Sequence, residues 1–254
     1  MNFTEYERMD RLEGSHWWFV AKRHFISILL KKHALLPSHQ KEAHVYKKAR
    51  MLDVGCGAGV ILSYFKSLGF ETSGIDVSDE ALKYCQLKGL DNLKKAPAES
   101  LPFPDNYFDV VTALDLLEHL DDEKYALKEV YRILQPNGIF IATVPMHKML
   151  WSYHDVAAHH KRRYSKKEIL KLVKSHFQNF SVGWIHCSIL IPLFIIRKLK
   201  QLMNCKTNET DVQEVPHQIN ACIKKYYFLE YLFYKIFGTL PFGTSLMVFA
   251  RKSL

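Results

Sequence analysis

A glycine-rich segment that follows a short apolar run is a candidate ligand-binding loop. It reads LDVGCGAG over residues 52–59, with single residues between Gly55, Gly57 and Gly59. Glycines let the chain turn sharply after a strand and let the backbone approach a ligand closely. Dinucleotide-binding loops use the spacing Gly-x-Gly-x-x-Gly instead, and Asp53 before this loop suits a cationic ligand better than a pyrophosphate. Sulfonium or amine groups would meet that requirement.

Acidic residues at the ends of later apolar runs extend this site. Asp76 ends TSGID, where a carboxylate can accept hydrogen bonds from both hydroxyls of a ribose. Its alternative role is to cap the helix that starts at Asp79. Ala98 and Glu99 follow the third run, which predicts an adenine edge there. The fourth run, DVVTAL, ends beside Asp115, whose loop we expect to close over the rest of the ligand.

The segment DLLEHL is the first of two clusters that could move a proton. Asp115, Glu118 and His119 lie at i, i+3 and i+4, on one side if the segment forms a helical turn. His119 is the leading candidate for a general base, since a neutral imidazole accepts a proton near pH 7. The three side chains could instead bind a divalent cation, or Glu118 and His119 could cap the loop. We predict a site without metal.

The second cluster lies in HDVAAHHKRRY, residues 154–164, after the fifth apolar run. His154 with Asp155 is an alternative catalytic pair, and the sequence does not choose between it and His119. Paired arginines suit bidentate recognition of phosphate or carboxylate, although a solvated basic face before a helix would look the same. The predicted substrate-binding residues are His159, Arg162, Arg163 and Tyr164.

The elements that must position these residues can be read from the hydrophobic pattern. Between residues 50 and 145 short β-rich runs alternate with helical patterns, which predicts a parallel sheet with covering helices. Ser78 and Ser165 are predicted N-caps, and Gly69 and Gly89 are predicted helix ends. A helix and two strands, NFSVGWIHC and SLMVFARK, are predicted to complete the sheet.

Three parts are predicted along the chain. Residues 1–49 form an N-terminal helical cap or lid, residues 50–187 and 245–254 form the ligand-binding domain, and residues 188–244 form an apolar helical insertion. Neither apolar stretch of the insertion reaches the roughly 20 residues that cross a bilayer, so no integral membrane span is expected. The insertion is expected either to cover a substrate or to lie on a membrane surface.

The charge of the chain is unevenly distributed. The net charge is +9, yet residues 51–145 carry 8 basic and 15 acidic side chains (−7), and the flanks carry 27 basic and 11 acidic ones (+16). The basic flanks could meet an anionic substrate or a membrane surface, or they could be solvated surface. Five cysteines without a Cys-x-x-Cys pair, and an N-terminus without a secretory pattern, predict a cytoplasmic protein, with peripheral contact at the inner membrane face as an option.

Several motifs in this order resemble a known family. LDVGCGAG, GIDVS, AESLPFPDNYFDVV, LDLLEHL and RILQPNGIFIATVP resemble the class I S-adenosylmethionine-dependent methyltransferases, in particular the methyltransferase type 11/12 group that includes ubiquinone-pathway enzymes. The resemblance covers residues 50–145 and, more weakly, the closing strands. It implies a Rossmann-like, doubly wound α/β fold whose seven-stranded sheet is mostly parallel with an antiparallel last strand. It also implies S-adenosylmethionine as cofactor, with contacts from Asp53, Gly55, Cys56, Gly57, Asp76, Val77, Ala98, Glu99 and Asp115. In ubiquinone-type O-methyltransferases similar Glu/His sets bind a cation, and Asp115 departs from the Glu found there.

The flanks are similar to a narrower group. EGSHWWFVAKR, LWSYHDVAAHHKRRYS and PFGTSLMVFARK resemble a bacterial and archaeal subgroup often associated with glycans or lipid-linked sugars. In such relatives the N-terminal segment tends to cover the cofactor pocket, so the resemblance makes Trp17 and Arg23 candidate lid residues that contact the cofactor. The alternative is that the aromatic cluster packs in the core.

The leading hypothesis is methyl transfer from S-adenosylmethionine to an oxygen of a small-molecule, lipid or lipid-linked saccharide acceptor, which the arginines would suit if it is anionic. The basic flanks motivate a second hypothesis, an RNA or other nucleic-acid methyltransferase. Nucleic acid is disfavoured as a partner because LDLLEH lacks the Asn/Asp-Pro-Pro-aromatic loop expected for methylation of base amines. A non-catalytic cofactor-binding scaffold at a membrane is the third hypothesis, and a nicotinamide dehydrogenase is the weakest.

Overall fold

The computed structural model describes residues 3–33, 48–203 and 211–254. Within these ranges the strands are β1 (Arg50–Val54), β2 (Glu71–Asp76), β3 (Leu93–Lys95), β4 (Phe108–Leu114), β5 (Leu134–Pro145), β6 (Asn179–Ile185) and β7 (Ser245–Arg251). The α-helices are α1 (Phe3–Ser15), α2 (Trp17–Lys32), α3 (Val60–Ser67), α4 (Asp79–Leu87), α5 (Glu123–Ile133), α6 (Tyr153–Ala157), α7 (Lys166–Lys174), α8 (Leu190–Leu202) and α9 (His217–Phe237). Two short 3₁₀ helices are η2 (Leu117–His119) and η3 (Lys148–Leu150). Parts of the predicted cap, at 34–47, and of the predicted insertion, at 204–210, lie outside the described residues.

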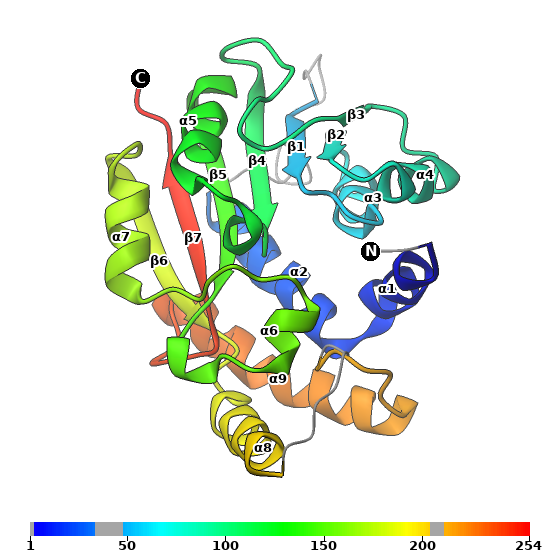
Figure 1. Ribbon diagram of the computed structural model, residues 1–254. Helices are drawn as coiled ribbons and strands as arrows, with labels where there is room; N and C mark the ends of the chain where they lie inside the picture. Colours follow the sequence, from blue (N-terminus) through cyan, green and yellow to red (C-terminus); the bar gives the residue numbers. More distant parts are fainter. Residues whose placement is uncertain (1–2, 34–47, 204–210) are drawn as a thin grey trace.

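The strands form one seven-stranded sheet in the order β3-β2-β1-β4-β5-β7-β6 (Figure 1). Only β7 among the described strands runs antiparallel to its neighbours β5 and β6, which confirms the predicted doubly wound, mostly parallel sheet. The order reverses between β1 and β4, so the helices that follow these two strands cover opposite faces of the sheet. Open α/β sheets have a crevice between the two loops at such a reversal. In open α/β sheets, ligands bind at this position.

Helices cover both faces of the sheet, as the continuous burial along β5 and β7 requires. Phe140 and Ala142 of β5 pack on one face with residues of α5 and α7, and Ile139 and Ile141 pack on the other with residues of α2, α3 and α9. Successive strand residues point to opposite faces, so a strand buried on both sides is apolar throughout. This explains the continuous apolar run of β5.

The predicted caps are confirmed. The Ser78 hydroxyl accepts from the backbone N–H of Ala81 at the start of α4. Ser165 and Glu168 form a reciprocal capping box at the start of α7. Gly69 and Gly89 follow α3 and α4 with φ of 95° and 69°, a left-handed conformation that ends a helix readily.

The predicted N-terminal cap and the predicted insertion both contribute to the core. Phe25 and Ile26 of α2 are fully buried, and they share an apolar cluster with Tyr227 and Tyr234 of α9. Helices α2 and α9 therefore pack together under one face of the sheet. Among the described residues, no helix is both long and apolar enough to cross a bilayer.

Candidate functional site

The glycine loop after β1 forms an open cradle. Gly55 and Cys56 donate backbone hydrogen bonds to Ile75 of β2, which fixes the start of the loop. Gly57 has φ of 51°, and a Cβ placed on it would meet no atom within 4 Å. The thiol of Cys56 instead lies in a small apolar cluster beneath the loop, so Cys56 offers only its backbone to a ligand.

Asp76 joins this cradle to the end of β2. Its Oδ2 accepts from the N–H of Gly57 at 3.0 Å, and its Oδ1 accepts from the N–H of Ser78 at 2.9 Å. A carboxylate offers about four acceptor positions. Asp76 can therefore bind a ribose and also support the start of the next helix, the two roles that were predicted as alternatives. Val77 beside it exposes 64% of its surface, an apolar area suited to a flat ring. Ala98 is buried after β3, and the neighbouring Glu99 is half-buried.

Three carboxyl groups converge beneath and beside the cradle. Asp53 is buried at the end of β1 and accepts a hydrogen bond from the Thr112 hydroxyl at 2.5 Å. Burial, helped by the nearby carboxylates of Glu13 and Asp76, outweighs the Thr112 hydrogen bond and raises the pKa of Asp53 to about 7. Burial likewise raises the pKa of Glu13, on α1, to about 7. An excess of buried carboxyl groups favours a cationic ligand, and these residues fit the sulfonium and amine of S-adenosylmethionine.

Asp115 follows β4 with φ of 51° and faces the N-terminal region. It accepts from the Thr143 hydroxyl at 2.6 Å and forms an ion pair with Lys22 of α2. Although burial raises its pKa, Lys22 and Thr143 outweigh burial and hold the pKa of Asp115 at about 2. The Lys22 ammonium also lies 5.6 Å from each of the Trp18 and Phe19 rings. No local motif around Lys22 predicted this contact.

The N-terminal residues divide between the core and the site. The Trp17 ring packs against Tyr227 of α9 at 5.4 Å, and its backbone N–H donates to Asn220. This geometry favours core packing for Trp17 over the predicted lid contact. Arg23 donates to the backbone oxygens of Glu13 and Gly14 at the end of α1. Because α1 packs against α3 and α4, Arg23 holds a helix that covers the cofactor side of the sheet.

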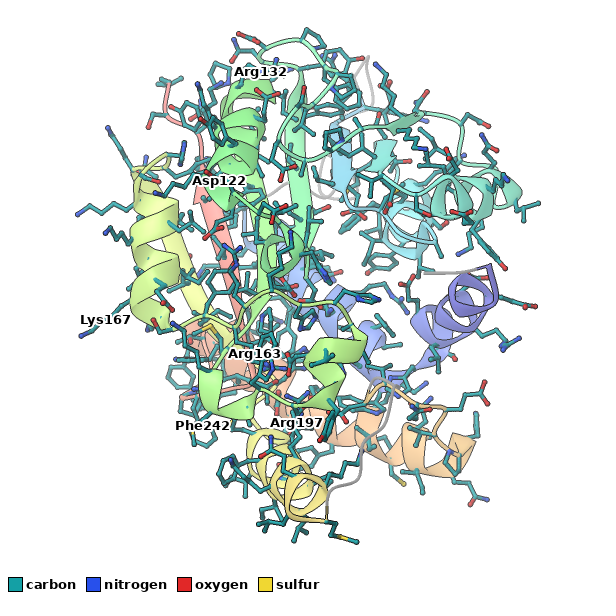
Figure 2. All side chains as sticks on the ribbon, in the orientation of Figure 1. Asp122, Arg132, Arg163, Lys167, Arg197 and Phe242 are labelled. Atoms are coloured by element: carbon teal, nitrogen blue, oxygen red, sulfur yellow. The ribbon has the colours of Figure 1, made fainter. Side chains whose placement is uncertain are left out.

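The structure does not support the catalytic role predicted for Asp155. This residue is fully buried at the centre of an ion-pair cluster. Its carboxylate accepts from His160 Nδ1 at 2.9 Å and from Arg163 Nε at 2.6 Å, and it lies 3.5 Å from Arg197 of α8. Figure 2 shows Arg163 beside the α6 region and Arg197 between that region and α8. These partners outweigh burial and hold the pKa of Asp155 well below its usual range, so it is a poor proton acceptor.

Arg162 and Arg163 do not form the predicted pair that would bind an anionic substrate. Arg163 is buried and bonded to Asp155 and to the Met146 carbonyl, while Arg162 pairs with Glu123 and donates to the Leu120 carbonyl. Both guanidinium groups therefore neutralise charges within the protein. The remaining predicted substrate residues are a buried tyrosine and an exposed histidine, Tyr164 and His159.

His154 is unsuited to act as a base in this arrangement. Its Nδ1 accepts a hydrogen bond from the backbone N–H of Asp211 at 2.9 Å, so that lone pair is already used. Burial, and then the nearby Arg197, lower the pKa of His154 to about 4. Both effects leave His119 as the better of the two predicted bases.

Glu118, His119 and His160 form a compact cluster at the end of β4. Each offers a ligand atom within 4.8 Å of those of the other two. His119 Nδ1 lies 3.3 Å from the carbonyl of His159, so Nδ1 carries the proton and Nε2 keeps a free lone pair; burial lowers the pKa of this imidazole. His160 has the same tautomer, because its Nδ1 donates to Asp155. His160 belongs to the second predicted cluster, but no catalytic or binding role of its own was predicted for it.

The Glu118 carboxyl group is the least satisfied member of this cluster. It is fully buried, and both oxygens are without a hydrogen-bond partner among the described residues. Burial, and then the neighbouring Asp115, raise its pKa well above its usual range. Asp115, Glu118 and His119 do not form the metal site considered from the sequence, because Asp115 is paired with Lys22. His160 takes its place in a set with Glu118 and His119 that could hold a cation.

Comparisons with known proteins agree with this geometry. A family model described as a methyltransferase domain matches residues 52–142. An uncharacterized methyltransferase of Bacillus subtilis, YcgJ, is 36% identical over 107 residues, 40% of this chain and 42% of that protein. A ubiquinone biosynthesis O-methyltransferase of Paraburkholderia phymatum is 30% identical over 154 residues, 56% of this chain and 64% of that protein. The matches thus span about half the length of these curated relatives.

Solved structures show the same fold over a longer range. An S-adenosylmethionine-dependent methyltransferase from Archaeoglobus fulgidus superposes with a TM-score of 0.59 and 20% identity, covering 98% of this chain and 99% of that chain. The putative methyltransferase in a complex with the Trm112 activator of Haloferax volcanii gives a TM-score of 0.61 at 20% identity, covering 99% and 95%. With its match to a methyltransferase domain over residues 52–142, its sheet order and its carboxylate-lined glycine loop, the chain has the fold of the class I S-adenosylmethionine-dependent methyltransferases.

Proposed function

We propose that the protein transfers a methyl group from S-adenosylmethionine to an oxygen atom of a small-molecule, lipid or lipid-linked saccharide acceptor. The paired imidazoles of His119 and His160 carry this proposal, because both keep Nε2 free at the end of β4. A neutral imidazole can remove the proton of a hydroxyl group as that oxygen forms its new bond. The ubiquinone biosynthesis O-methyltransferases among the relatives support oxygen as the acceptor atom.

The proposed residues have distinct roles. When bound, the cofactor supplies a methyl group on a sulfonium sulfur. Asp53 and Asp76 would hold its cationic and ribose parts, and α1 would keep water from the crevice. Nε2 of His119 would accept the proton of the acceptor hydroxyl group as that oxygen receives the methyl group. The imidazolium then returns that proton to solvent.

The buried carboxyl group of Glu118 supports a second version of this site. A divalent cation held by Glu118, His119 and His160 would give this orphaned group a partner. Metal-binding histidines commonly donate their other N–H to a carbonyl or carboxylate. His119 and His160 both do so, since their Nδ1–H groups donate to the His159 carbonyl and to Asp155. Such a cation would lower the pKa of an acceptor hydroxyl and replace the general base.

One experiment tests both versions. The full chain is incubated with methyl-labelled S-adenosylmethionine and with soluble, lipid and nucleic-acid fractions of its host, and the labelled product is identified. We expect label in a small molecule or lipid, and a loss of about 10²-fold or more in rate for His119→Gln. His176→Gln, in the turn between α7 and β6, serves as the control. If the base acts alone, chelation leaves the rate unchanged; if a cation acts, chelation abolishes activity and added Mg²⁺, Mn²⁺ or Zn²⁺ restores it.

Other outcomes would replace the proposal. Label in RNA or DNA would establish a nucleic-acid methyltransferase. Cofactor binding without label in any fraction would favour a non-catalytic scaffold.

A further inference from the structure

Helix α9 carries large apolar side chains on both its inner and its outer side. Tyr227 and Tyr234 on its inner side are buried in the core, yet Leu229 and Phe233 on its outer side face solvent. The apolar side of a surface helix normally faces the core, so a second apolar side that faces solvent calls for a partner. The sheet covers only one side of α9, so its outer side lacks a partner within the described structure.

Helix α8 lies at the same end of the molecule (Figure 1), and it too has an exposed apolar side. We call the outward side chains of the two helices the apolar face. Its members each expose between 41% and 81% of their surface: Ile191, Ile195, Leu199 and Leu202 of α8, and Leu229, Leu232, Phe233 and Ile236 of α9. Monomeric proteins rarely expose so many large apolar side chains together without an interaction to cover them.

The exposed charges on the two helices themselves are of one sign. Lys198 lies on α8, and Lys224, Lys225 and Lys235 lie on α9, whereas the only acid in the two helices is Glu230. Glu230 is buried and accepts from the backbone N–H groups of Cys187 and Ser188. An apolar surface bordered by lysines complements an anionic lipid surface. Two copies of this face would bring like charges together, which disfavours a symmetric pair.

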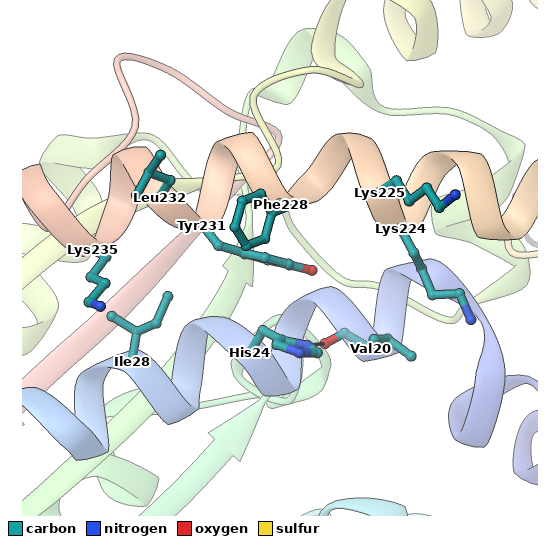
Figure 3. Close-up of a pocket in the computed structure, with 9 residues that line it drawn as sticks. All are labelled: Val20, His24, Ile28, Lys224, Lys225, Phe228, Tyr231, Leu232 and Lys235. Atoms are coloured by element: carbon teal, nitrogen blue, oxygen red, sulfur yellow. Dashed lines mark hydrogen bonds between the residues drawn. The ribbon is translucent and has the colours of Figure 1, made fainter.

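A groove between α2 and α9 continues this surface. Its volume is about 790 Å³, and Val20, Ile28, Phe228 and Leu232 form much of its apolar lining. Figure 3 shows Lys235 at one end of the groove and Lys224 with Lys225 at the other. The groove therefore combines room for apolar groups with cations at its ends.

The apolar face is tied to the segment that carries His160. Arg197 of α8 donates to the carbonyl of Leu150 and pairs with Asp155, and Gln201 donates to the carbonyl of Trp151 at 2.9 Å. Trp151 is itself partly exposed, and tryptophan is favoured at the boundary between lipid and water. The carboxyl ends of the parallel strands point toward this end of the molecule (Figure 1).

We propose that the outward faces of α8 and α9 dock on the surface of an anionic lipid bilayer and present the crevice to acceptors held in that bilayer. The docking itself depends only on the apolar face and its lysines. Its link to a lipid-borne acceptor rests on the proposed function.

Vesicle flotation of the full chain tests the docking. We expect binding to phosphatidylcholine vesicles with one quarter phosphatidylglycerol, weaker binding to phosphatidylcholine alone, and release by salt. The pair Leu229→Ser and Phe233→Ser should weaken binding about tenfold or more, because each loses apolar area that would enter the interface. Lys225→Gln and Lys235→Gln should each weaken it about fivefold. Exposed residues elsewhere serve as matched controls: Leu87→Ser, Tyr125→Ser, Lys83→Gln and Lys128→Gln.

Two results would overturn the docking. One is binding that is equal for neutral and anionic vesicles or unchanged by the α9 substitutions. The other is a dimer in solution that Phe233→Ser dissociates while no vesicle binds, which would assign the face to a second copy. Thermal stabilisation by S-adenosylmethionine, measured on the same samples, separates the two proposals. If no vesicle binds but S-adenosylmethionine still raises the Tm, only the docking proposal is refuted. If vesicles bind but S-adenosylmethionine does not raise the Tm, only the cofactor role is refuted.

Discussion

Asp53 sets the chemical character of the cofactor side. It is buried and accepts a hydrogen bond from Thr112, next to two further carboxyl groups, and its pKa is raised to about 7. A buried carboxylate without a counterion is destabilising, so Asp53 favours its protonated form as long as no cation is bound. A bound cation would offset that destabilisation. The same residue can therefore weaken the fold slightly and select the ligand.

Asp53→Asn should change how the stability of the cofactor-free protein depends on pH. The folded pKa of about 7 exceeds the usual aspartate value, so between about pH 4 and 7 the native state keeps a proton that the unfolded chain releases. The free energy of unfolding then falls as pH rises, by at most about 1.4 kcal/mol per pH unit for this group. In Asp53→Asn, the free energy of unfolding measured with urea should fall less steeply with pH. The part of the decline that remains would come from Glu13, whose pKa is also raised to about 7. The exposed control Asp91→Asn should keep the full slope, and an equally steep decline in both variants would contradict the assignment.

Among the secondary-structure elements, Asp155 holds α6, the following segment and α8 together. It offsets the charges of Arg163 and Arg197, both of which are buried. Asp155→Asn would leave two buried cations without this counterion, and removing one partner of a buried pair costs about 3–5 kcal/mol. We expect a loss of that size in the free energy of unfolding, measured with urea.

A matched surface pair separates this effect from a general loss of charge. Asp121 pairs with Lys161, and its side chain is 92% exposed. Asp121→Asn should cost less than about 1 kcal/mol, since exposed ion pairs contribute little. If Asp155→Asn were as stable as Asp121→Asn but inactive, Asp155 would have a catalytic role after all.

The sequence predicted the elements better than the contacts between them. The strand order, the caps at Ser78 and Ser165 and the glycine loop depend on local patterns or on the family resemblance, and the structure contains them. Side-chain pairing across long separations is not encoded in any local pattern. Lys22 meets Asp115 across 93 positions, and the adjacent Arg162 and Arg163 turn to different acids. A shared anion-binding role for the two arginines was therefore a reasonable prediction from their spacing, but the folded geometry does not support it.

At the scale of the whole molecule, the charge separation in the sequence acquires a spatial meaning. The acidic block of residues 51–145, with its net charge of −7, contains the glycine loop and the carboxylates that face the crevice. The basic flanks supply Lys22 and Arg23 beside the crevice and the lysines of α8 and α9 at one end of the molecule. A cationic cofactor and an anionic surface can therefore attract different parts of the same chain.

Cofactor binding should couple to protonation of the whole site. At 100 times its Kd a ligand adds about 2.7 kcal/mol to the free energy of unfolding, which raises the Tm of a chain this long by roughly 5–10 °C. The carboxyl groups of Asp53 and Glu13, with pKa values raised to about 7, are largely ionised at pH 8 and largely protonated at pH 6. S-adenosylmethionine should bind the ionised form, so a fixed concentration should raise Tm roughly half as much at pH 6 as at pH 8. S-adenosylhomocysteine lacks the sulfonium charge and should show a smaller pH effect, and NAD should give no shift. A Tm increase independent of pH, or larger at pH 6, would show that these carboxyl groups do not face the cation.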